Sequence, residues 1–256
     1  MAGRTTTLVY GVLCYAFFFG TFLYVIGFVG NWVVPKSIDT GMRGDTLPSV
    51  VINVALLGLF AVQHTIMARP GFKSWWTSKI PAPMERSTFV LATCIVLTLL
   101  FWQWRPMPTA VWHTDNSVAV WALSGLSLFG YLIVLYSSFL IDHFDLFGLR
   151  QVVLHYRARK YTHHPFAARS LYKLVRHPLM FGFLLAFWAT PSMSQGHLLF
   201  AIVTLVYILF GITVEERDLL QFLGDDYKSY RKRTPALIPF LPKGKGSGAG
   251  TDAAGR

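Results

Sequence analysis

The chain has 256 residues, of which 54% are hydrophobic and only 14% are charged, and its net charge is +11 at pH 7. Soluble domains usually carry about a quarter charged residues, so this composition disfavours a soluble domain and predicts a protein surrounded by lipid. It also disfavours a nucleic-acid-binding protein, because the basic residues flank apolar stretches instead of lining one soluble face.

Four apolar stretches are long enough to cross a bilayer as helices, which takes about 20 residues. They cover residues 8–34, 50–67, 87–104 and 118–141. Almost no charge interrupts them, as expected where a charge at a helix centre costs roughly 2.5–3.5 kcal/mol. The first stretch lacks the small-residue cleavage pattern of a signal peptide. We therefore predict an all-α, polytopic integral membrane protein whose residues 1–141 form a four-helix membrane region.

The apolar pattern changes in the C-terminal third. Residues 179–191 are too short to cross a bilayer comfortably, and a second apolar run, 197–214, follows the turn-like segment PSMSQG. We interpret the two runs as a helical hairpin, and the sequence leaves open whether it crosses fully. Residues 142–241 would then form a core made of a loop, this hairpin and a C-terminal segment. The Gly- and Ala-rich residues 242–256 predict a disordered tail.

The distribution of charge predicts an orientation. Basic residues are in excess in the segments 68–86 and 142–177 and near the C-terminus, whereas charges nearly balance in 39–45 and 105–115. By the positive-inside rule, the basic segments and both termini face the cytoplasm. We expect no metal site, because the adjacent His163 and His164 lack spaced partners.

Polar residues gather in two places. Five of the eight histidines lie in 143–177, a segment also rich in aromatics and cations. That composition suits either a cover over a polar ligand or contact with lipid headgroups. Glu215 and Glu216 follow the last apolar run directly, or lie mid-helix if that helix continues. They could pair with nearby arginines or hold the ammonium group of a ligand.

Considered together, the two clusters favour one ligand. A cationic loop facing an anionic helix end suits a molecule with both a carboxylate and an ammonium, such as S-adenosylmethionine. In this interpretation His177 holds one end of it and Glu215 the other, while the Tyr172 ring attracts its cationic part. Pro178 suits the first turn of the next helix, whose free N–H groups favour an anionic group.

Three motifs in this region resemble the isoprenylcysteine carboxyl methyltransferase superfamily of membrane enzymes. They are RHPLMFG at 176–182, EERDL at 215–219 and GDDYKSYRKRTPALIP at 224–239, and the resemblance covers roughly 164–239. It implies S-adenosylmethionine as cofactor. Its cofactor contacts fall within these motifs and just before them, with methionine at one position where the superfamily commonly has tyrosine. The residues are His164, Tyr172, Arg176, His177, Pro178, Leu179, Met180, Glu215 and Glu216.

The N-terminal two-thirds resemble one bacterial branch of that superfamily, the methanethiol S-methyltransferases. The resemblance is carried by FLYVIGFVGNWVVPKSID, QHTIMARPGFKSWWT, ERSTFV, FWQWRP and IDHFDLFGLRQV. It implies in-line methylation of a small thiol, methanethiol to dimethyl sulfide, at the cytoplasmic face of the bacterial inner membrane. The alternatives are a methyltransferase acting on a lipid or prenylcysteine and a non-catalytic membrane assembly or transport protein. The sequence leaves the oligomeric state open.

The reaction implied by the resemblance calls for a base, because a simple alkyl thiol is mostly protonated near pH 7. His143 is the preferred candidate, with Asp142 or Asp145 orienting it or replacing it, since all three follow the fourth apolar stretch. The same residues could instead cap a helix or pair with Arg150. His64, near the end of the second stretch, is the other candidate, because ionisable residues within membrane segments are usually functional. It could equally form a hydrogen bond between helices.

Overall fold

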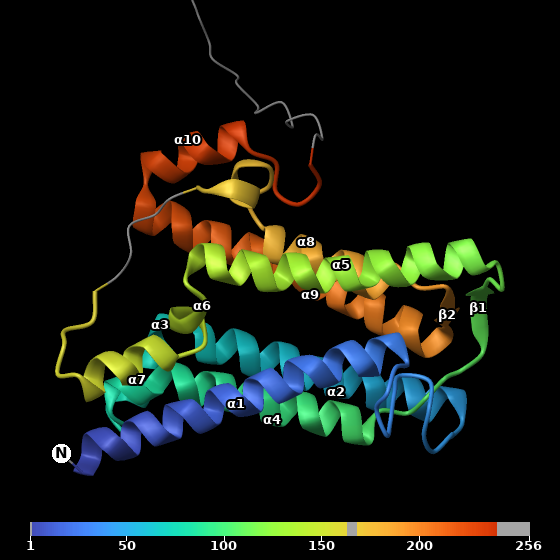
Figure 1. Cartoon of the computed structure of the whole chain (residues 1–256), viewed down its shortest axis with the longest axis horizontal. Helices are drawn as coiled ribbons and strands as arrows, with labels where there is room; N and C mark the ends of the chain where they lie inside the picture. The colour runs from blue at the N-terminus through green and yellow to red at the C-terminus, as the bar shows by residue number, and fades with distance from the viewer. Residues whose placement is uncertain (1, 163–167, 240–256) are drawn as a thin grey trace, which may run out of the picture.

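Long helices dominate the computed structural model, which describes residues 2–162 and 168–239 (Figure 1). Five described helices are long and apolar enough to cross a membrane. They are α1 (Ala2–Gly30), α2 (Thr46–Ala68), α4 (Glu85–Gln103), α5 (Ser117–Ile141) and α9 (Gln195–Leu223). The first four correspond to the four predicted stretches, although α1 ends at Gly30 and α4 at Gln103, before the predicted ends at 34 and 104. The α9 helix is the longer arm of the predicted hairpin. The prediction of an all-α, multi-pass membrane protein is therefore confirmed.

Shorter elements connect these helices. They are α3 (Pro70–Thr77), η1 (Ala82–Met84), β1 (Ala110–His113), α6 (His143–Leu146), α7 (Leu149–Tyr156), η2 (Ser170–Lys173), α8 (Pro178–Trp188), β2 (Ser192–Ser194) and α10 (Asp225–Arg233). The predicted tail, 242–256, lies outside the described residues.

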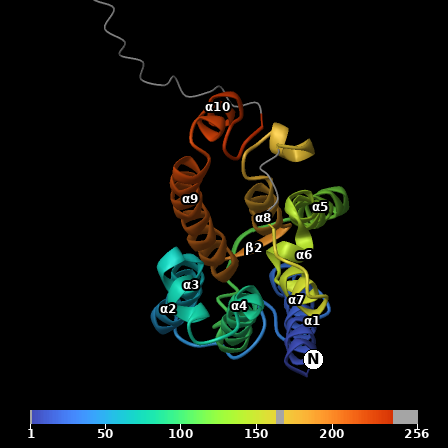
Figure 2. The same ribbon diagram turned by 90° about the vertical axis from the view of Figure 1, so that its left-hand side faces the viewer.

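The long helices run between two ends of the molecule, which we call the sheet end and the α10 end (Figure 1). At the sheet end, β1 and β2 pair antiparallel. At the α10 end lie α3, α6, α7, α10 and the start of α1 (Figures 1 and 2). The α8 helix leads towards β2, and α9 returns from there to α10, so α9 traverses the molecule, and the N-terminus lies at the α10 end (Figure 1).

Local sequence sets the helix ends. Asn116 accepts a hydrogen bond from the Ala119 N–H (3.0 Å) at the start of α5, and Ser194 accepts one from the His197 N–H (3.0 Å) at the start of α9. Both are side chains that favour this capping role. Pro178 occupies the first turn of α8, as predicted. At its far end α5 stops at Asp142, whose φ of 140° is rare for a residue other than glycine.

The hairpin has unequal arms, because α8 has 11 residues and α9 has 29. The short arm packs closely against α5 at two glycines. A Cβ at Gly182 would lie 2.6 Å from the Gly130 carbonyl oxygen, and one at Gly130 would lie 2.6 Å from that of Gly182. Small residues permit such close helix crossings in membranes. The start of α8 is thereby fixed relative to α5.

The apolar core divides into two clusters. The larger joins α1, α2, α4, α5, α8 and α9, and includes Phe28, Trp104 and Phe187. The smaller joins α4 to α1 and α2 through Phe89 and Cys94, with Phe18 and Met67 packed against them. Seen from the α10 end, the long helices surround the molecular axis (Figure 2). The polar residues of interest lie at that end, where α9 passes α8 and α10.

Candidate active site

An ion-pair cluster at the α10 end is centred on Glu216, whose side chain is only 9% exposed. Arg176 approaches it with Nε (2.7 Å) and Nη2 (2.6 Å), both at Oε1. Arg231 of α10 adds its Nε at 3.3 Å from Oε2. The Arg176 Nη1 donates to the carbonyl oxygens of Arg231 and Thr234. Because a buried carboxylate is costly unless it is paired, this cluster fastens α9 to the segment before α8 and to α10.

Main-chain hydrogen bonds reinforce this attachment. The Arg176 N–H donates to the Pro235 carbonyl (2.9 Å), and the His177 N–H donates to the Ala236 carbonyl (3.0 Å). The Tyr230 hydroxyl donates to the Tyr172 carbonyl oxygen. The three motifs recognised in the sequence therefore meet in space.

His177 lies between the two adjacent glutamates. Its Nε2 is 3.2 Å from Glu216 Oε1, and its Nδ1 is 3.4 Å from Glu215 Oε2. Burial by itself would lower the pKa of His177, but the contacts with Glu215 and Glu216 outweigh it and raise the pKa above 6.5. A raised pKa favours the imidazolium, which balances the two carboxylates.

The two glutamates differ in how much hydrogen-bond acceptor capacity their neighbours leave unused. Glu216 is buried and fully engaged, whereas the Glu215 side chain is 49% exposed and pairs with His177. Its remaining capacity as an acceptor faces outward beside the first turn of α8. The α8 helix begins at Pro178, and the N–H groups of Leu179 and Met180 have no intrahelical acceptor in this first turn. A carboxylate that can accept thus lies against His177, and N–H groups that can donate follow His177 in the chain.

His143 lies in a separate, aromatic environment. Its side chain is buried, and its ring stacks on Phe139 with 4.2 Å between ring centroids. The Ser138 hydroxyl donates to the Leu135 carbonyl (2.6 Å), so Nδ1–H of His143 donates to Ser138 Oγ (2.7 Å). Nε2 is then the acceptor for the Tyr15 hydroxyl (2.8 Å). Burial lowers the pKa of His143 although Asp142 opposes this effect, which favours the neutral imidazole.

Asp142 and Asp145 bind other partners. Asp142 caps α6 by accepting from the Asp145 N–H (3.1 Å). Arg150 approaches Asp145 Oδ1 at 3.0 Å and Asp142 Oδ2 at 3.6 Å. The Tyr161 hydroxyl also donates to Asp145 (3.0 Å), and burial together with this carboxylate raises the pKa of Tyr161 to about 12. These contacts match the alternative reading in which the acids cap a helix and pair with Arg150.

His64 has the more open ring. Its Nδ1 lies 3.4 Å from Thr93 Oγ1, and that hydroxyl donates to the Phe89 carbonyl (3.0 Å), so Nδ1 carries the proton. Its Nε2 has no hydrogen-bond partner among residues 2–162 and 168–239. Phe60 stacks on the ring at 5.4 Å. An imidazole with a bare nitrogen can accept a proton, and nothing in the sequence alone separated His64 from His143 in this respect.

Two further expectations from the sequence concern His164 and a metal site. His164 falls outside the described residues, so the structure says nothing of its place. Within the described part of the chain, no group of three or more His, Cys, Asp or Glu side chains is arranged to hold a metal ion.

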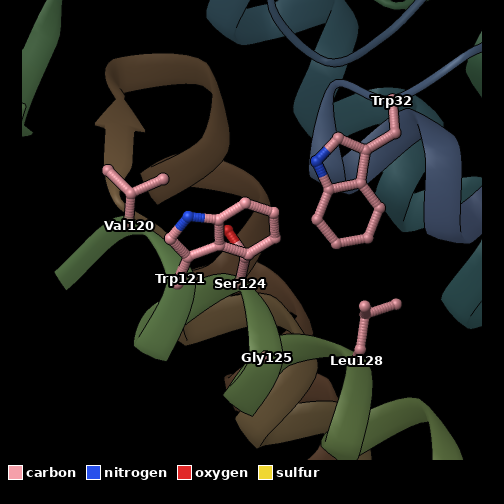
Figure 3. A pocket seen from close by; sticks show the side chains of 6 residues that line it. All are labelled: Trp32, Val120, Trp121, Ser124, Gly125 and Leu128. Carbon is pink, nitrogen blue, oxygen red and sulfur yellow. The ribbon is translucent and has the colours of Figure 1, made fainter. Parts of the chain in front are cut away.

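One hollow in the described part of the surface is unrelated to these clusters. It has a volume of about 420 Å³ and lies against the first half of α5. It is lined by Trp32, Val120, Trp121, Ser124, Gly125 and Leu128 (Figure 3). Ser124 supplies its one polar side chain besides the indole nitrogens. Its apolar walls suit lipid chains better than a charged ligand.

Comparison with known proteins gives concordant matches along most of the chain. A family model described as NnrU protein matches residues 52–234. Methanethiol S-methyltransferase 2 of Bradyrhizobium diazoefficiens is 51% identical over 241 residues, which cover 94% of this chain and 93% of that protein. Methanethiol S-methyltransferase of Mycobacterium tuberculosis is 50% identical over 240 residues, covering 93% and 97%. Nurim of Rattus norvegicus is 28% identical over 190 residues, covering 68% and 69%. No solved structure matches significantly.

Proposed function

Since the chain belongs to the family of NnrU proteins and methanethiol S-methyltransferases, we propose that it is an enzyme that methylates methanethiol to dimethyl sulfide. The observation that carries the proposal is the identity of about half the residues over more than nine-tenths of both chains. A match of this extent includes the membrane helices as well as the three C-terminal motifs. It therefore favours the small-thiol branch over lipid or prenylcysteine methylation.

S-adenosylmethionine is the cofactor that the α10 end fits best, and when bound it supplies an electrophilic methyl group on a sulfonium. Its ammonium requires an acceptor, and Glu215 is half exposed with capacity left. Its carboxylate requires donors, which the first turn of α8 at Leu179 and Met180 offers. Tyr172 is half-buried next to this turn and can cover a cationic or aromatic group. The charges of the described residues thus match the charges of the molecule.

The remaining expected cofactor residues have supporting roles in this proposal. Arg176 and Glu216 bind each other and fix α9 against α10. His177 joins that pair to Glu215 and so orients the exposed carboxylate. Pro178 starts α8 and leaves its first N–H groups free. His164 remains an expectation from the resemblance.

The chain's own residues must also take the thiol proton. His143 could do so through Tyr15, because the Tyr15 hydroxyl can accept the thiol proton while giving its own to Nε2. His64 could do so directly through its bare Nε2. Asp142 and Asp145 would hold Arg150 and the turn after α5, in support of His143. We propose His64 as the direct acceptor and His143 as the alternative.

The membrane arrangement follows from the charges. We propose that the α10 end, with both termini, faces the cytoplasm of a bacterial inner membrane, because the basic segments 68–86 and 142–162 lie there. Residues 142–241 then form the methyltransferase core, and residues 1–141 the membrane region that completes it. The small thiol and the lipid bilayer are the partners that this arrangement requires.

The test is direct. Purified protein is given S-adenosylmethionine and methanethiol, and dimethyl sulfide is measured in the headspace, while S-adenosylhomocysteine binding is measured separately by calorimetry. The proposal requires both product and binding. Binding without product would favour a lipid or prenylcysteine substrate, and absence of binding would favour a non-catalytic assembly or transport protein.

A further inference from the structure

A half-buried arginine on α4 has not been used by the function proposed above. Arg86 lies at the α10 end of α4, and its Nε donates to the Leu146 carbonyl (2.6 Å). Its guanidinium carbon is 4.9 Å from the centre of the Phe89 ring. Neither Nη1 nor Nη2 forms a hydrogen bond with any residue that the structure describes. A guanidinium has five N–H donors in a fixed fork, so four of them remain available.

The same Phe89 ring also lies against His64. The centroids of His64 and Phe89 are 4.9 Å apart, which equals the distance from Phe89 to the Arg86 guanidinium. Phe60 of α2 stacks on His64, and Tyr207 of α9 lies edge-on to it at 6.5 Å. We call Arg86, His64, Phe60, Phe89 and Tyr207 the Arg86 cluster. It combines one cation, one bare imidazole nitrogen and three aromatic rings.

The cluster lies inside the molecule yet is not sealed. Arg86 and His64 are surrounded by protein, but both keep part of their surface accessible. Neither has an atom among the buried polar atoms without a partner. Their free nitrogens therefore face accessible space and not packed side chains.

The position of the cluster relates it to the cofactor-binding residues. The α2 helix packs against both α4 and α9 (Figure 2). Tyr207 and Glu215 are eight residues apart on α9, which is roughly 12 Å along a helix. One helix thus carries a wall of the cluster and the glutamate proposed to hold the ammonium. A hydrogen bond joins the hydroxyl groups of Thr65 and Tyr207 (3.2 Å), and Arg69 forms an ion pair with Asp218 (2.9 Å). These two contacts keep α2 and α9 together.

We propose that the Arg86 cluster is the thiol half of the active site, in which Arg86 holds the sulfur as a thiolate and His64 receives its proton. This inference rests on the proposed function. A small thiol is an apolar group with one acidic S–H, and aromatic walls with one cation and one base match that chemistry. The S–H proton passes to Nε2 of His64, and the sulfur uses its electron pair to bond the methyl carbon as that carbon's bond to the sulfonium breaks. The imidazolium then loses its proton to solvent.

Several charged or titratable groups surround Arg86 and bear on the pH dependence. They are Glu85 on its own helix, His64 on α2, Lys73 on α3, Asp145 on α6, and Tyr161 after α7. Asp145 is already bound to Arg150. A positive charge favours a nearby thiolate, so Arg86 should allow turnover at lower pH than the free thiol would.

The decisive variant is Arg86→Gln, which keeps an N–H able to donate to the Leu146 carbonyl but removes the positive charge. With methanethiol and S-adenosylmethionine saturating, kcat at neutral pH should fall about 10- to 100-fold, as for loss of a hydrogen bond to a charged group. The rising limb of kcat against pH should move to higher pH. S-adenosylhomocysteine affinity, measured by calorimetry, should not change. Lys79→Gln removes one exposed positive charge at the same end and should alter neither quantity.

The outcomes separate the two proposals. A wild-type protein that forms no dimethyl sulfide refutes the proposed function itself. If the wild type is active, an Arg86→Gln variant with unchanged kcat and pH limb overturns the thiolate role, and one with weakened S-adenosylhomocysteine binding assigns Arg86 to the cofactor instead. Where Arg86→Gln does not fold, Arg86→Lys and His64→Gln decide. Arg86→Lys keeps the positive charge, so the rising limb of its kcat against pH must stay near that of the wild type, whereas His64→Gln must lower kcat, both at unchanged S-adenosylhomocysteine affinity. A limb moved to higher pH in Arg86→Lys, or unchanged turnover in His64→Gln, overturns the inference.

Discussion

The two ends of this molecule are held together by different chemistry. At the sheet end, neutral side chains bind main-chain atoms: Trp104 Nε1 donates to the Ile38 carbonyl (3.0 Å), and Asn53 both donates to the Arg105 carbonyl and accepts from the Arg105 N–H (2.8 Å each). At the α10 end, the corresponding attachment is the ion-pair cluster of Arg176, His177 and Glu216.

The difference shows where binding can occur. Asn53 and Trp104 are fully buried and already bonded to main-chain atoms, so these two side chains have little left to offer a polar ligand. The α10 end retains a half-exposed carboxylate at Glu215 and free N–H groups at the start of α8. The contacts of Asn53 and Trp104 therefore serve structure alone, whereas the ion-pair cluster at the α10 end leaves hydrogen-bonding groups beside it unused. Four experiments test this contrast.

The largest effect should follow from Arg176→Ala. The change leaves Glu216 buried with weaker pairing and leaves two carbonyl oxygens without their donor. Removal of one partner from a buried ion pair costs about 3–5 kcal/mol. Thermal unfolding in detergent should show a large loss of stability, accompanied by loss of S-adenosylhomocysteine binding. A variant of wild-type stability would mean that the cluster does not fasten α9 to α10.

Asn53→Leu probes the sheet end. It leaves the buried main-chain N–H and carbonyl of Arg105 without partners, at a cost of about 1–3 kcal/mol. The loss should appear in the unfolding temperature, with S-adenosylhomocysteine affinity of the folded protein unchanged. The exposed Lys79→Gln variant serves as control for both measurements. Weakened cofactor binding in Asn53→Leu would contradict the independence of the two ends.

Glu215→Gln should separate binding from folding at the α10 end. The side chain is half exposed, so its neutral replacement should leave the unfolding temperature close to wild type. Affinity for S-adenosylmethionine should fall about 10-fold, because the amide no longer attracts an ammonium. Calorimetry measures this, and Glu216→Gln is the matched variant. Glu216→Gln should lower stability, and the reverse pattern would exchange the roles of the two glutamates.

The smallest effect concerns pH. The glutamates raise the pKa of His177 above 6.5 in the folded protein. The imidazolium therefore contributes stability in full below about pH 6.5, and this contribution is lost as the pH rises through the raised pKa. The unfolding temperature of the wild type should decline across that window more than that of His177→Gln. Parallel curves for the two proteins would show that His177 does not titrate in this way.

The sequence determined the architecture because hydrophobic length is a property of the chain. Four uninterrupted apolar stretches predicted α1, α2, α4 and α5, and the structure confirms them. Motifs of the N-terminal two-thirds, among them QHTIMARPGFKSWWT and IDHFDLFGLRQV, predicted the methanethiol S-methyltransferases, which the relatives confirm. Pro178 predicted the start of α8, because a missing N–H costs little there.

Only the tertiary structure decided which member of each polar pair is available. Adjacent residues on a helix point about 100° apart, so packing alone buries Glu216 against Arg176 and exposes Glu215. Likewise, His143 is occupied by Tyr15, 128 residues away in sequence, whereas His64 keeps a bare nitrogen. Arg86 drew no attention in the sequence because one arginine at the start of an apolar helix resembles any interfacial anchor. Its free donors become visible only when α2, α4 and α6 are placed around it, since contacts between distant segments depend on packing and not on local pattern.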